Sequence, residues 1–387
     1  MTLSGPRVAV FGAGAFGGWT ALELVRRGAA VTLVDAWAPG NARASSGGST
    51  RVIRATYGRH AIYTRMAGHA LRRWEDYDAR WNAGLLHRTG VLWLFGEDTS
   101  FGDASAATLK NHGIALDEIS FADAQRRYPQ IALDAVSRVV FEPAAGYLFA
   151  KRACMHVADR VVAEGGTLRQ AAAVSPVVID GRGVKLADGS ILEADLFVFA
   201  CGPWLGALFP HVIGPLVTPT RQEVYYFGLP PGDARFLPPA LPVWVECAER
   251  FTYGIPAADG HGFKVADDTP GPVMDPTSDD RVPTPDGDRL VRAVLARRFP
   301  ALRDAPLIGS EVCQYESTPD SHFIIDRHPD DPRIWIAGGG SGHGFKMGPV
   351  IGEMVASLVL DAVRPDPCFG LARFARRPPD GWPAKWA

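Results

Sequence analysis

The stretch "RVAVFGAGAFGGWTALELVRRG", residues 7–28, decides the fold of this chain of 387 residues. A short apolar, β-like run ends in a glycine turn, and apolar residues then recur at helical spacing until Gly28. The run "AAVTLVDA" at 29–36 follows as a second buried strand. Strand, glycine turn, helix and strand form a βαβ unit, which requires parallel strands and a right-handed crossover. The pattern predicts a doubly wound α/β fold.

The first glycine loop carries the residue types that hold a dinucleotide. Gly12, Gly14 and Gly17 stand between strand and helix, and Asp35 ends the second strand. Glycines let the backbone approach a pyrophosphate, the helix N-terminus offers free N–H groups, and an acidic side chain accepts hydrogen bonds from ribose hydroxyls. A purely structural glycine turn is the alternative, but here strand, helix and acid are all in place. The pattern predicts a dinucleotide and leaves NAD and FAD both open.

A second strand–glycine–helix pattern lies near the C-terminus, in "RIWIAGGGSGHGFKMGPVIGEMVASLVL" at 333–360. A single nicotinamide domain has no need of this element. A helix N-terminus there suits the pyrimidine edge of a flavin, where negative charge accumulates on reduction. A tight turn beneath a core helix is the alternative. The late loop therefore favours a flavin.

Between these two elements the pattern changes, and the change predicts two interleaved domains. After a polar helix near 61–82, strand-like runs and turn-rich spacers replace the α/β pattern, which resumes at 150–202. Residues 222–265 hold four strand candidates, as is typical of an antiparallel sheet. We expect an α/β plus α+β protein: a Rossmann-like FAD-binding domain built from the discontinuous segments 1–88, 146–220 and 312–387, and an inserted antiparallel-sheet substrate domain from 89–145 and 221–311.

The composition excludes several classes of function. A hydrophobic fraction of 47% with 21% charged residues is typical of a globular protein, and a formal charge of -2 gives no electrostatic reason to expect nucleic acid or an anionic membrane as a partner. The N-terminus lacks a signal-peptide pattern, so we expect a cytoplasmic protein. The five cysteines form no CxxC pair, which fits neither a zinc site nor a disulfide framework, and no metal is expected.

Five residues have side chains whose sequence context suggests a function. Arg51 and Arg54 in "STRVIRATYG" and Lys346 in the late loop suit a carboxylate ligand, although a solvated surface position is the alternative for each. Lys264 lies in an apolar strand pattern, where a cation must either serve a function or reach solvent. Cys313, in "SEVCQYESTPDSHFIID", has polar neighbours. It either faces a sheet interior by alternation or takes part in chemistry.

Eight landmarks occur in a specific order along the chain: "GAGAFGGWTALELVRRG", "STRVIRATYG", "RTGVLW", "FEPAAGYLFA", "CGPW", "RFTYGIPAADGHGFKVADD", "VCQYESTPDSHFIIDRHP" and "AGGGSGHGFKMG". In these landmarks the chain resembles, nearly end to end, the FAD-dependent amine oxidases of the D-amino acid oxidase-like superfamily that include monomeric sarcosine oxidase and N-methyltryptophan oxidase. The resemblance implies oxidation of the C–N bond of a carboxylate-bearing secondary or primary amine to an imine, with oxygen reduced to hydrogen peroxide. It also implies a monomer whose partners are a small amine and oxygen.

The resemblance assigns roles to the residues of the substrate site. It implies that Cys313 carries the FAD through a thioether to the 8α-methyl group, and a thiolate is the nucleophile that such a bond requires. It implies that Arg54 and Lys346 clamp the substrate carboxylate, while Tyr253 and Tyr315 line the pocket. Tyr315 is also a candidate catalytic residue.

The resemblance assigns further residues to catalysis and to the cofactor. Lys264 is similar to the cation that promotes reaction with oxygen, and Arg51 to a residue beside the flavin ring. Asp35 matches the ribose position, and Val174 matches a backbone contact to adenine. The other cofactor-binding residues expected from the resemblance are Gly12, Gly14, Ala15, Phe16, Gly17, Ser46, Thr50, Cys201, Gly202, Trp204, Gly340, Gly342, His343, Gly344 and Lys346.

The chain departs from the family pattern at three places. A pocket histidine of the sarcosine-type enzymes is Asp268 here, and a methionine of the pocket wall is Trp244, so neither position favours sarcosine itself. Asp268 suits a cationic or hydroxylated side chain, and Trp244 suits a ring or fills space. A histidine pair before the Thr-Arg element is replaced by Ser46 and Gly47, which bears on how easily a covalent flavin forms.

Three other functions stay open from the sequence. A FAD-dependent amine dehydrogenase would use another electron acceptor in place of oxygen. An NAD-dependent dehydrogenase would use the first glycine loop and leave the late loop and Cys313 unexplained. A noncatalytic dinucleotide-binding protein would leave Arg54, Lys264 and Lys346 as surface charge.

Overall fold

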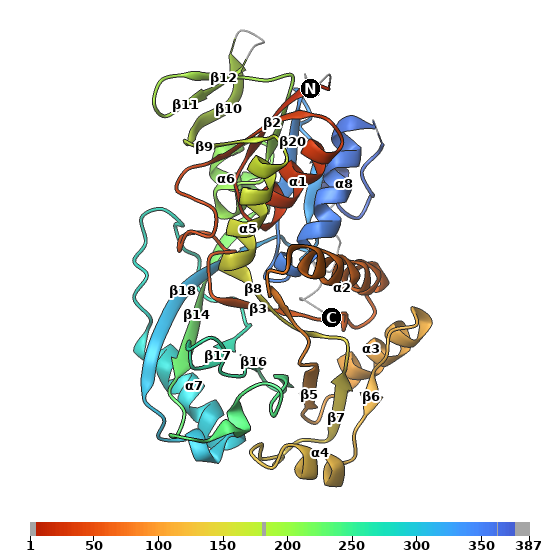
Figure 1. Cartoon of the computed structure of the whole chain (residues 1–387), viewed down its shortest axis with the longest axis vertical. Helices are drawn as coiled ribbons and strands as arrows, with labels where there is room; N and C mark the ends of the chain where they lie inside the picture. Colours follow the sequence, from red (N-terminus) through yellow and green to blue (C-terminus); the bar gives the residue numbers. More distant parts are fainter. Residues whose placement is uncertain (1–4, 180–182, 362, 376–387) are drawn as a thin grey trace.

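The computed structural model describes residues 5–179, 183–361 and 363–375. Its elements form two regions that follow one another along the long axis of the molecule (Figure 1). One region holds a six-stranded sheet with the first and last long helices. The other holds an eight-stranded sheet, and the candidate site lies where the two regions meet.

The six-stranded sheet forms because its strands are short apolar runs that helices cover. Its order is β19-β20-β13-β1-β2-β9, parallel except for the edge strand β19. These strands are β1 (Arg7–Phe11), β2 (Ala30–Asp35), β9 (Thr167–Gln170), β13 (Leu196–Phe199), β19 (Ile324–Arg327) and β20 (Ile334–Gly338). Helix α1 (Ala15–Arg26) packs against α5 (Ala150–Ala163) and α8 (Gly348–Leu360). The predicted Rossmann-like α/β sheet is confirmed, but it is not doubly wound: the three long helices pack together, and the other face of the sheet packs against β11 (Gly183–Leu186) and α6 (Leu205–Leu208).

The eight-stranded sheet has the order β18-β14-β17-β16-β15-β5-β7-β6. Its strands are β5 (Val91–Phe95), β6 (Asp117–Glu118), β7 (Arg138–Glu142), β14 (Thr218–Phe227), β15 (Val243–Cys247), β16 (Phe251–Ile255), β17 (Phe263–Asp267) and β18 (Leu307–Ser317). All pairs are antiparallel except β15 with β5, which is parallel. The expected antiparallel sheet is therefore mixed at the pair that joins the two inserted segments, because no hairpin fixes the direction of strands so far apart in sequence.

Smaller elements complete the chain. Two three-stranded sheets contain β10 (Ala173–Ile179), β11 (Gly183–Leu186) and β12 (Ile191–Glu193), and β3 (Thr50–Ile53), β8 (Gly146–Phe149) and β4 (Leu86–His87). The remaining helices are α2 (Ala61–Trp81), α3 (Ser100–Asn111), α4 (Phe121–Arg127), α6 (Leu205–Leu208) and α7 (Pro285–Arg298). The short 3-10 helices are Gly202–Trp204, Gly214–Leu216, Ala234–Phe236, Pro300–Leu302, Phe345–Met347 and Leu371–Ala375.

The division into two domains remains a prediction, and two of its boundaries fall inside strands. The boundary at 220 lies within β14 and the boundary at 312 lies within β18. These two long strands pair from Thr218 with Ser317 to Phe227 with Leu307. Strand β18 rises from the lower sheet toward the upper region (Figure 1), so one element carries Cys313 and Tyr315 to the junction.

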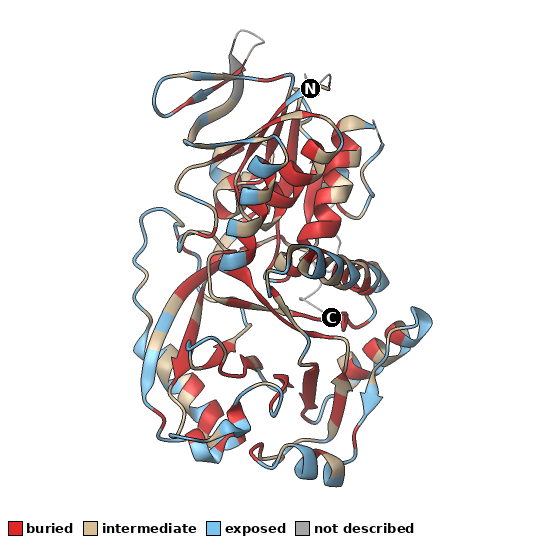
Figure 2. Ribbon diagram, in the orientation of Figure 1, coloured by how far each residue is buried: buried red, intermediate tan, exposed pale blue. Residues whose placement is uncertain are grey.

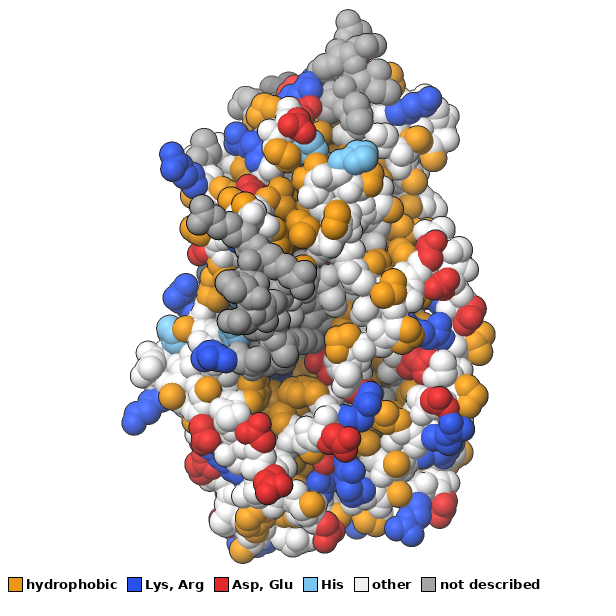
Figure 3. Space-filling model, turned by 180° about the vertical axis from the view of Figure 1, so that it is seen from behind, with side chains coloured by type: hydrophobic (Ala, Val, Ile, Leu, Met, Phe, Trp, Pro, Cys, Tyr) orange, Lys and Arg blue, Asp and Glu red, His pale blue; other side chains and the backbone are white. Residues whose placement is uncertain are grey.

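The buried residues concentrate in the strands of both sheets and on the inner sides of the helices (Figure 2). Over the described part of the back face, Lys and Arg side chains alternate with Asp and Glu side chains (Figure 3). Every helix among the described residues is too short or too polar to cross a bilayer.

Candidate active site

A cavity of about 490 Å³ follows the carboxyl ends of β1, β2 and β13. Ligands of open α/β sheets bind at this edge, since the strands end there and the next helices begin. Most of the expected cofactor residues line it: Gly12, Gly14, Ala15, Phe16, Asp35, Ser46, Arg51, Val174, Cys201, Gly202, Trp204, Gly340, Gly342 and Gly344. Five others do not line it, namely Gly17, Thr50, Cys313, His343 and Lys346.

Two glycines of the first loop have no room for a side chain. Gly12 has a φ of +99°, and a Cβ on it would lie 2.3 Å from the carbonyl oxygen of Ala200. A Cβ on Gly17 would lie 1.8 Å from the carbonyl oxygen of Gly12, so Gly17 sits behind the cavity wall and holds the loop against α1. The Ala13 N–H donates to Asp35 at 2.8 Å, and burial raises the pKa of that carboxyl while this hydrogen bond lowers it. The loop is therefore fixed in one shape.

Two buried oxygens beside this cavity lack a hydrogen-bond partner among the described residues, Ser45 Oγ and Glu316 Oε2. Buried polar atoms are nearly always paired, so these two indicate a polar ligand. The glycine loop at the N-terminus of α1 suits a pyrophosphate, and Asp35 suits a ribose. The residues present therefore fit a dinucleotide such as FAD.

A second, smaller cavity of about 70 Å³ adjoins the first. The two share Arg51, Tyr315, Gly342 and Phe345, so a ligand in one touches the boundary of the other. The smaller cavity also brings together predicted residues from both regions of the molecule: Arg54, Tyr253, Asp268, Cys313, His343 and Lys346.

Two buried cations face the smaller cavity. Arg54 is 7% exposed, and its guanidinium lies 4.7 Å from the ring centre of Tyr57 and 5.2 Å from that of Trp93. Lys346 is 5% exposed, and its Nζ donates to Tyr57 Oη at 3.0 Å and to the carbonyl oxygen of His343 at 3.1 Å. Tyr57 thus contacts both cations, and burial raises its own pKa. Both cations therefore lie in the lining of one cavity, and the buried Glu142 interacts electrostatically with Arg54.

Two further predicted residues line the smaller cavity and are hydrogen-bonded to each other. Tyr315 Oη donates to Asp268 Oδ1 at 2.6 Å, and both residues line the cavity. Burial raises the pKa of Tyr315 and that of Tyr253, so both phenols stay protonated at neutral pH. The lining of the cavity therefore combines two cations with a hydrogen-bonded carboxyl group.

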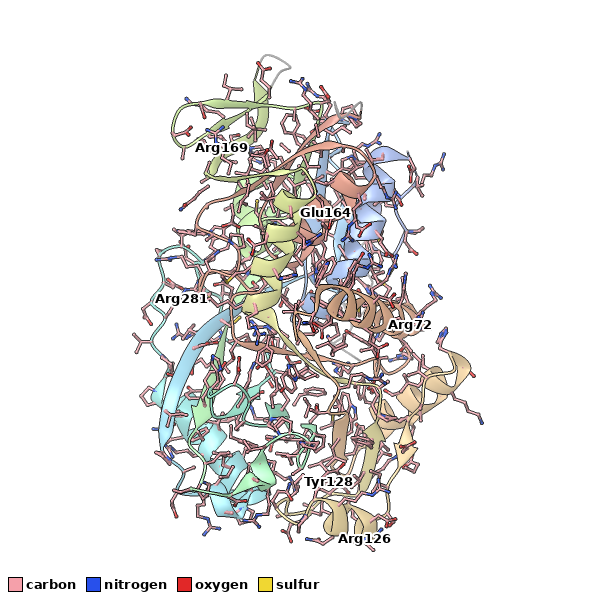
Figure 4. All side chains as sticks on the ribbon, in the orientation of Figure 1. Arg72, Arg126, Tyr128, Glu164, Arg169 and Arg281 are labelled. Carbon is pink, nitrogen blue, oxygen red and sulfur yellow. The ribbon has the colours of Figure 1, made fainter. Side chains whose placement is uncertain are left out.

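Cys313 lies on β18, at the rim of the smaller cavity. Arg51 donates to its sulfur at 3.2 Å, and the same guanidinium donates to the carbonyl oxygens of Thr50 and Ser45 at 2.8 and 2.7 Å. This hydrogen bond holds the sulfur beside Arg51. Arg281, on the long loop beside β18 (Figure 4), donates to the carbonyl oxygen of Val312 at 3.0 Å and braces the same stretch.

Lys264 lies behind the cavities. It is 1% exposed, and its Nζ donates to the carbonyl oxygen of Thr50 at 2.8 Å. Burial lowers the pKa of Lys264 to about 7; Arg51 acts in the same direction, whereas Glu311 and Cys313 oppose the shift. The lysine is therefore partly charged near neutral pH. Thr50 is its anchor and lies outside the lining of both cavities.

Trp244 was expected on the pocket wall, and this expectation is wrong. Its side chain is fully buried between Phe263 and Phe299 in the core of the eight-stranded sheet. Side chains alternate along a strand, so Val245 is the residue of β15 that lines the smaller cavity.

Two functional candidates were not identified from the sequence. Tyr57 follows Arg54 in the quoted stretch, and an aromatic residue beside a candidate carboxylate site was an available signal. Glu316 follows Tyr315, and nothing in the sequence separates it from the other polar residues of that strand.

Comparisons with known proteins agree with this geometry. A family model described as "FAD dependent oxidoreductase" matches residues 7–358. The chain is 30% identical over 364 residues to monomeric sarcosine oxidase of Bacillus sp. (strain B-0618), covering 91% of this chain and 92% of that protein. It is 27% identical over 376 residues to N-methyl-L-tryptophan oxidase of Salmonella arizonae, covering 94% of this chain and 96% of that protein. The crystal structure of L-proline dehydrogenase from P. horikoshii has a TM-score of 0.83 at 23% identity, over 96% of this chain and 98% of that one.

Proposed function

Since the chain belongs to the FAD dependent oxidoreductases, as a sarcosine oxidase-like enzyme that acts on amine donors, we propose that it oxidises the C–N bond of a small amine carrying a carboxylate. The product is an imine, oxygen accepts the electrons, and hydrogen peroxide is formed. The relatives named monomeric sarcosine oxidase support a monomer.

One observation carries the proposal: Arg54 and Lys346 line one small cavity that borders the long cofactor cavity. Arg binds a carboxylate bidentately and Lys adds a point charge, so two cations in the lining of one small cavity suit a substrate carboxylate. A bound amino acid would then have its α-carbon held at the boundary between the cavities.

FAD, when bound, supplies the acceptor for the two electrons and the hydrogen lost by the amine. The glycine loop suits its pyrophosphate and Asp35 its ribose, and we propose Cys313 as the residue that attaches its flavin ring. Arg51 donates a hydrogen bond to the Cys313 sulfur and so fixes its position at the rim of the smaller cavity.

The residues of the smaller cavity orient the substrate and limit its size. Arg54 and Lys346 bind the carboxylate and so hold the substrate in a fixed orientation relative to the cofactor, which accelerates the reaction over a random encounter in solution. Asp268 and Tyr315 would contact the other groups of the bound amino acid. They would favour a substrate whose side chain or amine donates hydrogen bonds. A water-sized position takes about 10–15 Å³. About 70 Å³ therefore offers roughly five such positions, which favours a small amino acid.

Replacing either cation by alanine tests the proposal. Arg54→Ala and Lys346→Ala each remove a charge-assisted contact worth about 1.5–3 kcal/mol, or about 10- to 150-fold in kcat/KM for a carboxylated amine. For the same amine without its carboxylate, the two substitutions should lower kcat/KM much less. Lys151→Ala, on the exposed side of α5, is the matched control. Unchanged kinetics with the carboxylated amine in both variants would remove these residues from the site.

A further inference from the structure

Glu316 is a buried acid in the wall of the long cavity that no expected role explains. It is 8% exposed and lies on β18, directly after Tyr315. The Gly340 N–H donates to its Oε1 at 3.1 Å, and a Cβ added to Gly202 would lie 3.3 Å from its Oε2. The carboxyl group therefore sits where the segments that follow β13 and β20 meet.

The second carboxyl oxygen of Glu316 lacks a partner among the described residues. Burial raises the pKa of Glu316 to about 7, and the hydrogen bond from Gly340 opposes this shift. Leaving a buried acceptor unpaired costs free energy, which a ligand that hydrogen-bonds to it would offset. Gln314 is the preceding residue on the same strand face. Its side-chain oxygen Oε1 does have a partner, because Arg281 donates to it at 2.6 Å.

The order of residues along the long cavity indicates what part of a dinucleotide reaches Glu316. Asp35 and Val174 mark the nucleoside end, and the glycine loop at Gly12 follows. Tyr315 marks the other end, which borders the smaller cavity. Glu316 lies at the ends of β13 and β20, and the sheet order β2-β1-β13-β20 puts these ends beyond the glycine loop of β1 on the side away from Asp35. In FAD, the segment between the pyrophosphate and the flavin ring is the ribityl chain, a polyol.

We infer that Glu316 hydrogen-bonds to ribityl hydroxyl groups of FAD and positions the chain between its pyrophosphate and its flavin. A hydroxyl both donates and accepts, so it pairs with this acid whether the carboxyl is protonated or ionised. A phosphate is a worse partner, because it repels the ionised form. The inference rests on the FAD family of the chain and stands independently of which amine is oxidised.

The test measures FAD affinity in a Cys313→Ser background, so that binding is reversible. Glu316→Ala should raise the Kd for FAD about 10- to 150-fold, whereas Glu316→Gln, which still donates and accepts, should lose less. FAD analogues that each lack one ribityl hydroxyl should identify the hydroxyl that Glu316 binds. Loss of that hydroxyl should weaken FAD binding to the Cys313→Ser parent but not to Glu316→Ala in the same background. Ser317→Ala, on the opposite strand face, is the control and should change the Kd less than about twofold.

Two outcomes would overturn the inference. One is an unchanged Kd for FAD in Glu316→Ala. The other is that each analogue loses the same affinity in the parent as in Glu316→Ala. Thermal unfolding separates ligand binding from a structural role. Glu316→Leu removes both the buried acid and the acceptor of the Gly340 N–H, so without FAD it should unfold at a temperature no higher than the parent, and its unfolding temperature should rise less on adding FAD. An equal rise on adding FAD in Glu316→Leu and in the parent would make Glu316 a structural residue.

Discussion

Replacing Lys264 by methionine should slow the reaction of the reduced enzyme with oxygen. Methionine keeps much of the apolar length of the side chain and removes only the buried ammonium. Electron transfer to oxygen creates negative charge, which a nearby cation stabilises. At about 4 Å and an effective dielectric constant near 20, this attraction is on the order of 4 kcal/mol, or roughly a thousandfold in rate if fully expressed.

The structure adds a pH dependence to this prediction. Because burial lowers the pKa of Lys264 to about 7, the side chain is about nine-tenths charged at pH 6 and about one-tenth charged at pH 8. The rate constant for reoxidation should therefore fall about tenfold between these pH values, and about tenfold more by pH 9. Lys264→Met should be slow and show no such slope.

The same pKa shift has a consequence for stability. In the unfolded chain the lysine keeps the ordinary pKa of 10.5. Between about pH 7 and 10.5 the unfolded state therefore binds more protons than the folded state, and the free energy of unfolding should rise with pH. Lys264→Met should lack this rise, which chemical denaturation of the apoprotein across the window would measure.

Stopped-flow mixing of anaerobically reduced protein with oxygenated buffer decides the matter, with flavin absorbance as the signal. Lys185→Met, at an exposed position of β11, is the matched control and should behave as the parent. Equal reoxidation rates in Lys264→Met and the parent would refute the reasoning. They would also favour a FAD-dependent dehydrogenase with another electron acceptor.

Two further substitutions test the cofactor and the substrate side of the site. Cys313→Ser should still fold and bind FAD, but acid precipitation should release its flavin into the supernatant, whereas the parent should keep its flavin in the pellet; complete release from the parent would disprove attachment. Asp268→Asn removes the carboxylate that accepts from Tyr315, so amines with cationic or hydroxylated side chains should lose at least about tenfold in kcat/KM relative to apolar ones. An unchanged preference across such a panel would exclude Asp268 from substrate selection.

The local part of the fold was predictable because its signals are local. The first βαβ unit follows from apolar periodicity and Gly12, and the helix at Ala61–Trp81 follows from its spacing. Helix α7 was not predicted, although Thr284 caps it and Pro285 begins it, because its polar, turn-like start hides the apolar positions behind it. The parallel pairing of β15 with β5 depends on contacts between distant segments, which no local pattern encodes.

The site was predictable mainly where the resemblance supplied whole motifs. Arg54 and Lys346 were named from such motifs, and the structure brings them to one cavity. Trp244 was placed wrongly, because motif matching ignores which face of the strand a residue occupies. Tyr57 and Glu316 gain their roles from packing between segments far apart in the chain, so composition and spacing do not reveal them.

Anaerobic reduction of the flavin by a panel of small amines tests the central claim most directly. The account predicts that N-methyl, cyclic or other small amino acids bleach the yellow colour of the enzyme, and that the same amines without a carboxylate do so far more slowly. Failure of every carboxylated amine to bleach the flavin, or equal rates with and without the carboxylate, would contradict it.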